Sequence, residues 1–310
     1  MKNSLADEAE ALGLPPKQVR KVLDCYRVES GKHFRLKDHD PGDTAGHLLK
    51  KEHADALLTS SVRRLSELQE RLYAEGTWAL LCVFQAMDAA GKDGTIKHVL
   101  TGVNPQGVEV TSFKAPGPEE LAHGFLWRCV RALPERGRIG IFNRSHYEEV
   151  LVVRVHPDLL DRQRLPRGLA GKDIWDQRLE AIVDFERYLA RQGMAVVKFF
   201  LHISEAEQRR RFLARLDTPE KNWKFSAADL AERAHWDEYM AAYEAAITAT
   251  STPWAPWHVL PADHKPLLRA LAAEVIVEAI DSLELAWPQP TDEERAANAE
   301  ARRRLLAEAD

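Results

Sequence analysis

Short apolar runs recur along the chain between longer segments with helical spacing. The first run, 78–84, is apolar throughout and lacks alternation, which is typical of a strand buried on both faces. Helical stretches separate most of the runs, and strand–helix–strand repetition predicts a parallel sheet. We therefore expect a three-layer α/β/α fold with a five-stranded parallel sheet. The expected strands are 78–84, 108–113, 139–143, 196–202 and 257–260.

Apolar positions at helical spacing predict a long helix over 47–75, which should end at Gly76. Residues 31–46 lack a clear period and are expected to form an extended arm. Residues 204–250 are charged and almost wholly helical in pattern, so they form an inserted module between the fourth and fifth strands. The chain then divides into an N-terminal helical extension (1–30, with a helix starting near Pro15 and Pro16), a main domain (31–287) and a charged C-terminal helix or tail (288–310).

Composition narrows the class of protein. The 310 residues are 45% hydrophobic, which suffices for a packed core. No apolar run reaches the roughly 18 residues of a membrane span, and the N-terminus does not resemble a signal peptide. The three cysteines are far apart in sequence, so we expect a cytoplasmic protein. The net charge of −5 argues against nucleic-acid binding, and a polyanionic substrate would need locally concentrated positive charge.

A candidate phosphate loop, FQAMDAAGKDGTI, lies over 84–96 between the first strand and a helix. Backbone N–H groups at such a helix start converge on one point and favour an anion. The match to G-x-x-x-x-G-K-[ST] is imperfect, because Ala86 replaces the first glycine and Asp93 the hydroxyl residue. The alternative is a glycine-rich turn that binds nothing. The expected phosphate-binding residues are Ala90, Gly91, Lys92, Asp93, Gly94 and Thr95.

Two carboxylates in this loop predict a metal. Asp88 and Asp93 would repel a phosphate chain by about 4 kcal/mol per charge pair at ~4 Å. The loop therefore makes sense if cations intervene, and we expect Mg²⁺ to bridge the two carboxylates and phosphate oxygens. A second role for Asp88 is to orient, or accept a proton from, the attacking phosphate.

The third strand ends in a polar segment, IGIFNRSHYEE, at 139–149. The carboxyl ends of parallel strands meet at one edge of the sheet, so this segment should lie beside the phosphate loop. Arg144 suits a bidentate grip on phosphate, and Asn143 and Glu148 are expected to contribute to the binding site. Glu149 is a candidate metal ligand. The alternative is that Arg144 pairs with these glutamates on a surface helix.

The inserted module carries the local positive charge that a polyanion requires. Within 208–224, six basic and two acidic residues give a net charge of +4. Arg211 and Arg215 are four residues apart and share one helical face. A helical lid with these arginines would neutralise a transferred phosphoryl group and exclude water. The alternative is an ordinary solvated helix.

Taken in order, the quoted segments resemble the polyphosphate kinase 2 family. The resemblance also rests on LQERLYAEG, FKAPGPEELAHGFLWR, EEVLVVRVHP, EAEQRRRFLARLDTPEKNWKFSAADLAERAHWDEYMAAYE and TSTPWAPWHVLPADHK, and it covers roughly residues 33–285. It implies a thymidylate-kinase-like fold, a phosphate-loop core with a helical lid. It also implies reversible, Mg²⁺-dependent transfer between inorganic polyphosphate and adenine or guanine nucleotides, with Mn²⁺ as an alternative ion, in a homo-oligomer (dimer or tetramer).

The resemblance assigns roles to individual residues. Asn143 stands where many members have Asp, and with the following EEVLVVRVHP it is similar to the subgroup that accepts AMP and ADP. Lys221 and Lys224 are implied polyphosphate contacts, and Asp88 and Asp93 are implied metal ligands. The implied catalytic residues are Asp88, Lys92, Arg144, Arg211 and Arg215.

Two other functions share these features. A nucleoside monophosphate kinase that uses ATP as donor would have the same loop and lid. A phosphate-loop switch protein would bind nucleotide without turnover. Only the identity of the phosphoryl donor, or the lack of any transfer, separates them from the first interpretation.

Overall fold

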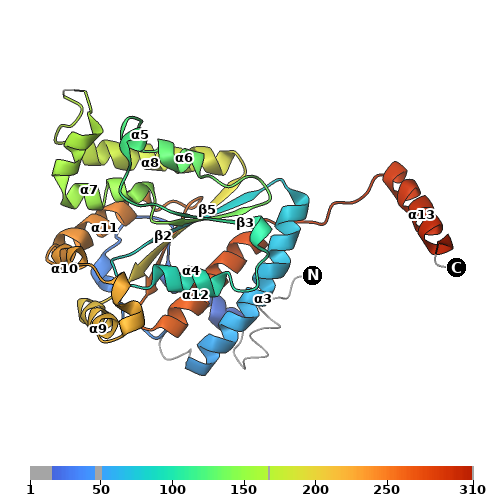
Figure 1. Ribbon diagram of the computed structural model, residues 1–310, viewed down its shortest axis with the longest axis horizontal. Coiled ribbons are helices and arrows are strands. Elements are labelled where there is room, and N and C mark those ends of the chain that lie inside the picture. Colours follow the sequence, from blue (N-terminus) through green and yellow to red (C-terminus); the bar gives the residue numbers. More distant parts are fainter. Residues whose placement is uncertain (1–15, 46–50, 167, 309–310) are drawn as a thin grey trace.

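The computed structural model describes residues 16–45, 51–166 and 168–308. Its sheet has six strands in the order β1-β6-β5-β2-β4-β3. Neighbouring strands from β6 to β3 pair in parallel, whereas β1 pairs antiparallel with β6 (Figure 1). The strands are β1 (Arg27–Val28), β2 (Ala79–Gln85), β3 (Val108–Ser112), β4 (Ile139–Asn143), β5 (Met194–His202) and β6 (Trp257–Pro261).

The five predicted strands form the parallel part of this sheet, and the prediction of five strands in total is wrong. The sixth strand, β1, has only two residues, Arg27 and Val28, which pair with His258 and Trp257. Two residues are too few to show a hydrophobic period, so their pairing is a tertiary contact that the sequence pattern does not reveal.

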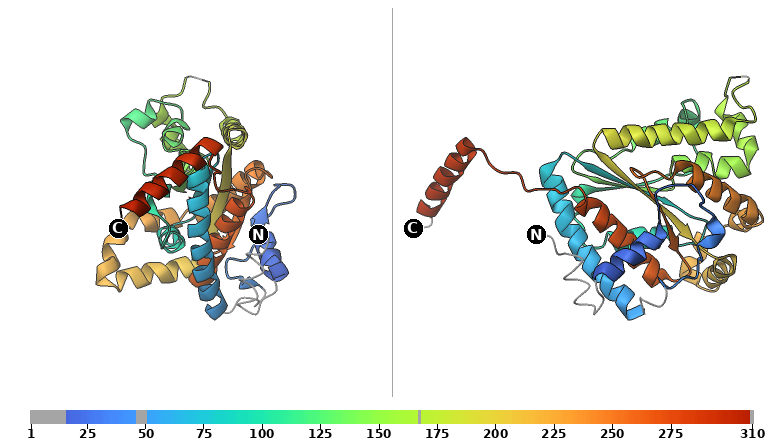
Figure 2. Two further views of the ribbon diagram at one scale, coloured as in Figure 1. Left: turned by 90° about the vertical axis from the view of Figure 1, so that its right-hand side faces the viewer. Right: turned by 180° about the vertical axis from the view of Figure 1, so that it is seen from behind.

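Helices lie on both sides of the sheet (Figures 1 and 2). On one side α8 packs against β5 and α11, and on the other α12 packs against α3, α4 and β5. The described helices are α2 (Pro16–Tyr26), α3 (Lys51–Glu75), α4 (Lys92–Val99), α5 (Pro118–Leu121), α6 (Trp127–Arg131), α7 (Val152–Val155), α8 (Ile174–Arg191), α9 (Glu205–Leu216), α10 (Ala227–Arg233), α11 (Trp236–Thr250), α12 (Lys265–Asp281) and α13 (Asp292–Ala307), with 3₁₀ turns η1 (Leu36–Asp38), η3 (Pro105–Gly107), η4 (His146–Glu149), η5 (Pro157–Gln163) and η6 (Pro219–Lys224).

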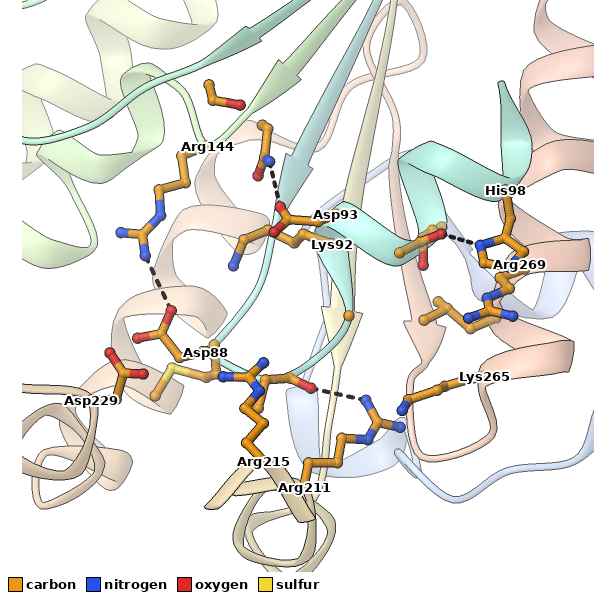
Figure 3. A pocket seen from close by; sticks show the side chains of 18 of the residues that line it. Asp88, Lys92, Asp93, His98, Arg144, Arg211, Arg215, Asp229, Lys265 and Arg269 are labelled. Atoms are coloured by element: carbon orange, nitrogen blue, oxygen red, sulfur yellow. Dashed lines mark hydrogen bonds and ion pairs between the residues drawn. The ribbon is translucent and has the colours of Figure 1, made fainter. Parts of the chain in front are cut away.

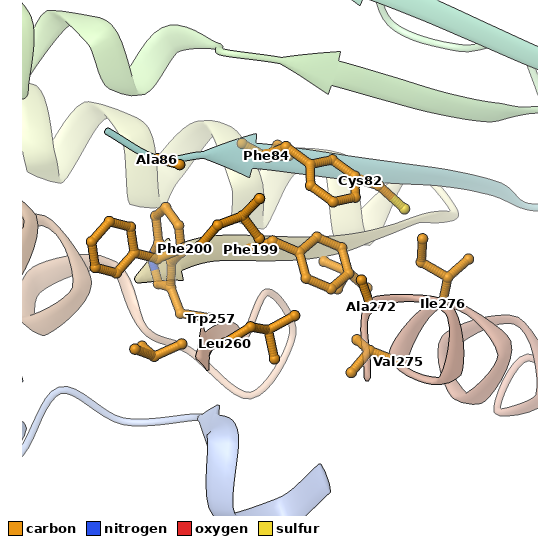
Figure 4. Packing of buried hydrophobic residues seen from close by; sticks show 14 of the residues in the cluster. Cys82, Phe84, Ala86, Phe199, Phe200, Trp257, Leu260, Ala272, Val275 and Ile276 are labelled. Atoms are coloured by element: carbon orange, nitrogen blue, oxygen red, sulfur yellow. The ribbon is translucent and has the colours of Figure 1, made fainter. Parts of the chain in front are cut away.

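Strand β2 runs through the centre of the core, which explains its unbroken apolar sequence. All seven of its residues are buried. Phe84 stacks on Phe199 of β5 with ring centroids 4.5 Å apart. Figure 4 shows Ala272, Val275 and Ile276 of α12 beside these strands. The end of β2, where the phosphate loop begins, is therefore fixed by packing on both faces.

The ends of the predicted segments show where the pattern was informative. Helix α3 ends one residue before Gly76, whose φ of 65° is the left-handed conformation that glycine favours. The described part of α2 buries Val22, Leu23 and Tyr26, so this part of the extension belongs to the main core. Residues 1–15, and with them the predicted helix start at Pro15, lie outside the described residues. Helix α13 buries no residue and stands away from the rest of the chain (Figures 1 and 2). Among the described helices, none has the length and apolarity needed to cross a bilayer.

The inserted module is shorter than the predicted 204–250. Helix α11 buries one face in the core, so it belongs to the body of the protein. The segment that projects over the sheet edge consists of α9, η6 and α10 (Figure 1), and we call it the lid segment. The buried residues of α11 are Tyr239, Ala242, Tyr243, Ala246, Ile247 and Thr250.

A buried ion pair joins α8 to the sheet, and its lysine also binds the end of α11. Lys198 of β5 donates from Nζ to Glu186 Oε2 of α8 at 2.5 Å, to the Thr250 carbonyl at 2.8 Å and to the Tyr147 hydroxyl at 3.1 Å. Burial alone would raise the pKa of Glu186. Lys198 and His146 lower it by more, so the pKa is lower than its usual value. Burial also lowers the pKa of Lys198, and Glu186 opposes that shift. The hydrogen bonds of Lys198 connect β5 with α8, α11 and η4.

Replacing Lys198 by methionine should lower the free energy of unfolding by about 3 kcal/mol, because Glu186 would stay buried without its main partner. Urea unfolding measures the change. Lys37→Met, at an exposed position, is the control and should change the free energy by less than about 0.5 kcal/mol. A loss below about 1 kcal/mol for Lys198→Met would contradict a stabilising role for the pair.

Candidate active site

A cavity of about 890 Å³ opens at the carboxyl ends of β2, β3 and β4, beneath the lid segment. The phosphate loop forms its floor, and the side chains that face it come from α4, α9, α10 and α12 as well (Figure 3). Its lining includes Asp88, Gly91, Lys92, Asp93, Gly94, Thr95, His98, Lys114, Asn143, Arg144, Arg210, Arg211, Arg215, Trp223, Asp229, Lys265 and Arg269.

The loop after β2 has the backbone geometry of an anion site. Gly91 precedes the first residue of α4 with φ 107°, in the left-handed region where a side chain would be strained. The Thr95 N–H donates to the Gly91 carbonyl at 2.9 Å and begins the helical hydrogen bonds. The amides of Lys92 and Asp93 precede this bond at the positive end of the helix, where an anion is favoured.

Lys92 folds back over the loop. Its Nζ donates to the Ala86 carbonyl at 2.6 Å. Burial and Arg144 lower the pKa of Lys92, while Asp88, Glu148 and Asp93 raise it. A phosphate oxygen at this position would supply the negative charge that favours the ammonium form. The lysine can thus exchange a bond to the protein for a bond to phosphate.

Arg144 connects the end of β4 to the loop. Its guanidinium donates to Asp88 Oδ1 at 3.1 Å and to Glu148 Oε2 at 3.2 Å. The side chain is 39% exposed and lines the cavity. Glu148 raises the pKa of Arg144, burial lowers it, and Asp88 raises it again, with a net rise. Arg144 is therefore a permanent cation between two carboxylates, positioned to bind phosphate.

Asp88 and Asp93 fit a metal that is shared with phosphate. The Asn143 Nδ2 donates to Asp93 Oδ1 at 2.7 Å, so each carboxylate is oriented by a residue at the end of β4. Among the described residues, no group of three or more His, Cys, Asp or Glu side chains could hold a metal by itself. Mg²⁺ is commonly bound by one or two carboxylates together with substrate phosphates and water, and this donor set matches that pattern.

Glu149 does not fit the predicted role of a metal ligand. It is 4% exposed and accepts hydrogen bonds from Arg178 at 2.9 Å and Gln163 at 2.7 Å. The 3₁₀ turn η4 directs Glu149 into the protein, while Glu148 faces Arg144. Neither glutamate lines the cavity, so Glu148 acts on the site through Arg144. Ala90, a loop residue predicted to bind phosphate, is fully buried and does not line the cavity.

The lid segment brings further charge to the cavity. Arg215 lies over the Phe212 ring at 5.6 Å, and Asp229 of α10 lies beside Asp88 (Figure 3). Burial and Asp88 raise the pKa of Asp229. Trp223 is 77% exposed and lines the cavity. The side chains of Lys221 and Lys224, the predicted polyphosphate contacts, lie outside the described residues.

Sequence reasoning missed the cations at the start of α12. Lys265 and Arg269 lie one helical turn apart and reach the cavity on the side of α4 (Figure 3). Lys265 follows β6 by a few residues, and the end of a parallel strand is where ligand-binding residues gather. The position of Lys265 just after a predicted strand could therefore have indicated it as a candidate from the sequence. Lys114, which follows β3, carries the same signal.

Comparisons with known proteins identify relatives of this chain. The family model of polyphosphate kinase 2 matches residues 48–288. The ADP-polyphosphate phosphotransferase of Rhodopseudomonas palustris is 54% identical over 257 residues, covering 83% of this chain and 89% of the relative. The AMP/ADP-polyphosphate phosphotransferase of Meiothermus ruber is 48% identical over 265 residues, covering 86% and 95%. The crystal structure of polyphosphate kinase 2 from Arthrobacter aurescens TC1 superimposes with a TM-score of 0.81 at 44% identity, covering 90% of this chain and 96% of that one.

Proposed function

The chain belongs to the polyphosphate kinase 2 family, and we propose that it transfers phosphoryl groups between inorganic polyphosphate and AMP or ADP. The observation that carries the proposal is the cavity itself. Lys265 and Arg269 lie on one side of the loop, and Arg144 lies on the other with Asp88 and Asp229 (Figure 3). Two anionic chains can therefore approach Lys92 from opposite sides.

The transfer needs no covalent enzyme intermediate. A terminal phosphate oxygen of the acceptor attacks the last phosphorus of the polyphosphate chain in line, and a new P–O bond forms. The bridging P–O bond breaks, and polyphosphate leaves one unit shorter. Lys92 and Arg144 bind the oxygens on which charge accumulates. One phosphoanhydride replaces another, so the reaction is reversible, and concentrations set its direction.

We propose that Asp88 and Asp93 hold Mg²⁺, or Mn²⁺ in its place, together with phosphate oxygens. When bound, the ion would neutralise those oxygens and align donor and acceptor. The protein's contribution is orientation, because Arg144 and Asn143 each fix one carboxylate.

We propose that the lid segment closes over the transferred phosphoryl group with Arg215 facing it. Arg210 and Arg215 of α9 line the cavity and add positive charge on the lid side of the loop. Closure would exclude water, which competes with the acceptor for the phosphoryl group. In this proposal the catalytic domain is 31–287 in three layers, and the lid is α9 to α10. The dimer or tetramer, the cytoplasmic location and the use of guanine nucleotides stay predictions.

Arg215→Ala should raise the KM for polyphosphate about tenfold, because one charge-assisted contact to the chain is lost. The dependence of log KM on log salt should also become less steep, by about one unit for one contact. Steady-state kinetics at several salt concentrations measure both. The exposed Arg209→Ala on the same helix is the matched control. An unchanged KM in Arg215→Ala would remove Arg215 from the polyphosphate path.

A labelled-donor experiment distinguishes the proposed function from a kinase that uses ATP. The enzyme receives AMP with Mg²⁺, ³²P-labelled polyphosphate and unlabelled ATP in equal phosphoryl concentration. We expect the label in ADP. Unlabelled ADP would support the ATP-dependent kinase, and no ADP at all would support the switch protein.

A further inference from the structure

Arg211 uses its whole guanidinium on the protein. The side chain is 5% exposed. Nε donates to Glu207 at 2.7 Å, Nη1 to the carbonyls of Ala89 and Ala90 at 3.0 and 2.8 Å, and Nη2 to those of Ala262 and Asp263 at 2.6 and 3.2 Å. A guanidinium has five N–H groups, and each has an acceptor here. A phosphate contact would require one of these bonds to break.

Gln208, one helical turn before Arg211, grips the same loop. It is 1% exposed, and its Nε2 donates to the Asp88 carbonyl at 2.9 Å. Its Oε1 accepts from Arg233 of α10 at 2.8 Å. One face of α9 therefore binds three consecutive carbonyls of the phosphate loop, those of Asp88, Ala89 and Ala90.

These bonds determine where the loop amides point. In a trans peptide the carbonyl and the following N–H point in opposite directions. Because the Ala90 carbonyl is held toward α9, the Gly91 N–H points away from α9. Ala89 has φ 64°, a left-handed conformation that a residue with a Cβ adopts only when its surroundings impose it. The hydrogen bonds from α9 to the carbonyls of Asp88, Ala89 and Ala90 can hold this conformation in place.

The same helix is anchored at its base. The Ser204 N–H and Oγ donate to the two carboxylate oxygens of Asp263 at 2.8 and 2.7 Å. Arg233 donates to Glu205 as well as to Gln208, so α10, which brings Asp229 to the cavity, is joined to α9. A movement of the lid segment would thus act directly on the carbonyls of the loop.

We propose that Gln208 and Arg211 are positioning residues, which set the conformation of the phosphate loop from the lid segment. Arg211 acts through the loop carbonyls and not as a phosphate ligand, in contrast to the catalytic role predicted from the sequence. The kinetic part of this inference rests on the proposed function. The structural part concerns the protein alone.

Hydrogen exchange of the full-length protein without substrates tests the structural part. The readout is the peptide that contains Ala90 and Thr95, whose N–H groups donate to Met87 and Gly91. Arg211→Lys keeps the charge but loses the fork, because an ammonium cannot span carbonyls on two segments. We expect about tenfold faster exchange in this variant, corresponding to easier local opening. The exposed Arg209→Lys should match wild type.

Gln208→Glu is the milder second variant, which keeps the acceptor for Arg233 but presents a carboxylate to the Asp88 carbonyl. It should speed exchange of the same peptide about threefold. Wild-type exchange in both variants, with the fold intact by circular dichroism, would overturn the inference. This result is independent of whether the protein uses polyphosphate, so a failure of the proposed function is recognised separately.

Kinetics test the kinetic part. Arg211→Lys should lower kcat about twentyfold, with less than a threefold change in the KM for polyphosphate and an unchanged salt slope. The double variant with Gln208→Glu should lose less than the product of the two single losses, because both act on the same carbonyls. A charge contact with phosphate predicts a different result: Arg211→Lys, which keeps the positive charge, would retain most of kcat.

Discussion

Lys92→Ala should lower kcat about 1,000-fold, the largest loss that a single substitution is expected to cause in this protein. The ammonium is held over the loop by a 2.6 Å bond to the Ala86 carbonyl, so it is already positioned before phosphate binds. Removing it leaves the charge that develops on the transferred oxygens without its nearest cation. Polyphosphate-dependent formation of ADP from AMP, measured at saturating substrates, gives the loss.

Lys97→Ala is the matched control for this prediction. Lys97 lies on the same helix, α4, but it is exposed and does not line the cavity. Its replacement should leave kcat within about twofold of wild type, as for an ordinary surface change. Near-normal turnover in Lys92→Ala would show that the loop is not the site of transfer.

Asp88→Asn should lower kcat about 100-fold and raise the Mg²⁺ concentration needed for half-maximal rate about tenfold. The amide keeps the size of the side chain but has no charge for a cation. It also weakens the 3.1 Å contact with Arg144, which would then lean toward Glu148. A Mg²⁺ titration of the rate, repeated with Mn²⁺, measures both effects.

Asp184→Asn removes an exposed carboxylate on α8, far from the cavity lining, and serves as the control for charge. Its Mg²⁺ titration should coincide with that of wild type. A wild-type titration curve in Asp88→Asn would exclude Asp88 as a metal ligand, and the pair with Arg144 would then be its only role at the site.

The parallel part of the fold could be predicted because its strands are buried on both faces. An unbroken apolar run such as that of β2 is typical of a buried strand, and the predicted helix after it is present and buries Ile96 and Val99. Strand β1 and the inward face of α11 could not be predicted. Both depend on contacts with segments that are distant in sequence. Because the residues before α11 are highly charged, the whole stretch was predicted to be one charged module.

The candidate site shows the same division. Arg144, directly after β4, and Lys92, at the end of the loop after β2, line the cavity as the sequence pattern predicts. Glu149 was misplaced because the chain makes a 3₁₀ turn after Ser145, and one residue of difference reverses the direction of a side chain. For Arg211, the sequence indicates an arginine on the same helical face as Arg215. It does not reveal the five oxygen atoms of the protein that accept the hydrogen bonds of its guanidinium.

The charge distribution accounts for how an acidic protein can bind a polyanion. The net charge is −5, yet cations from β4, α9 and α12 converge on one cavity. Within about one Debye length, roughly 8 Å at physiological salt, this local field outweighs more distant charges. Polyphosphate binding should therefore depend strongly on salt, even though the protein as a whole is negative.

Product analysis with polyphosphate as the sole phosphoryl donor tests the central claim most directly. The purified protein is incubated with Mg²⁺, polyphosphate and either AMP or ADP, in the absence of ATP, and the nucleotides are separated by anion-exchange chromatography. We predict that AMP yields ADP, that ADP yields ATP, and that Lys92→Ala yields neither above background. Wild-type protein that forms no product from either acceptor unless ATP is supplied would contradict the account.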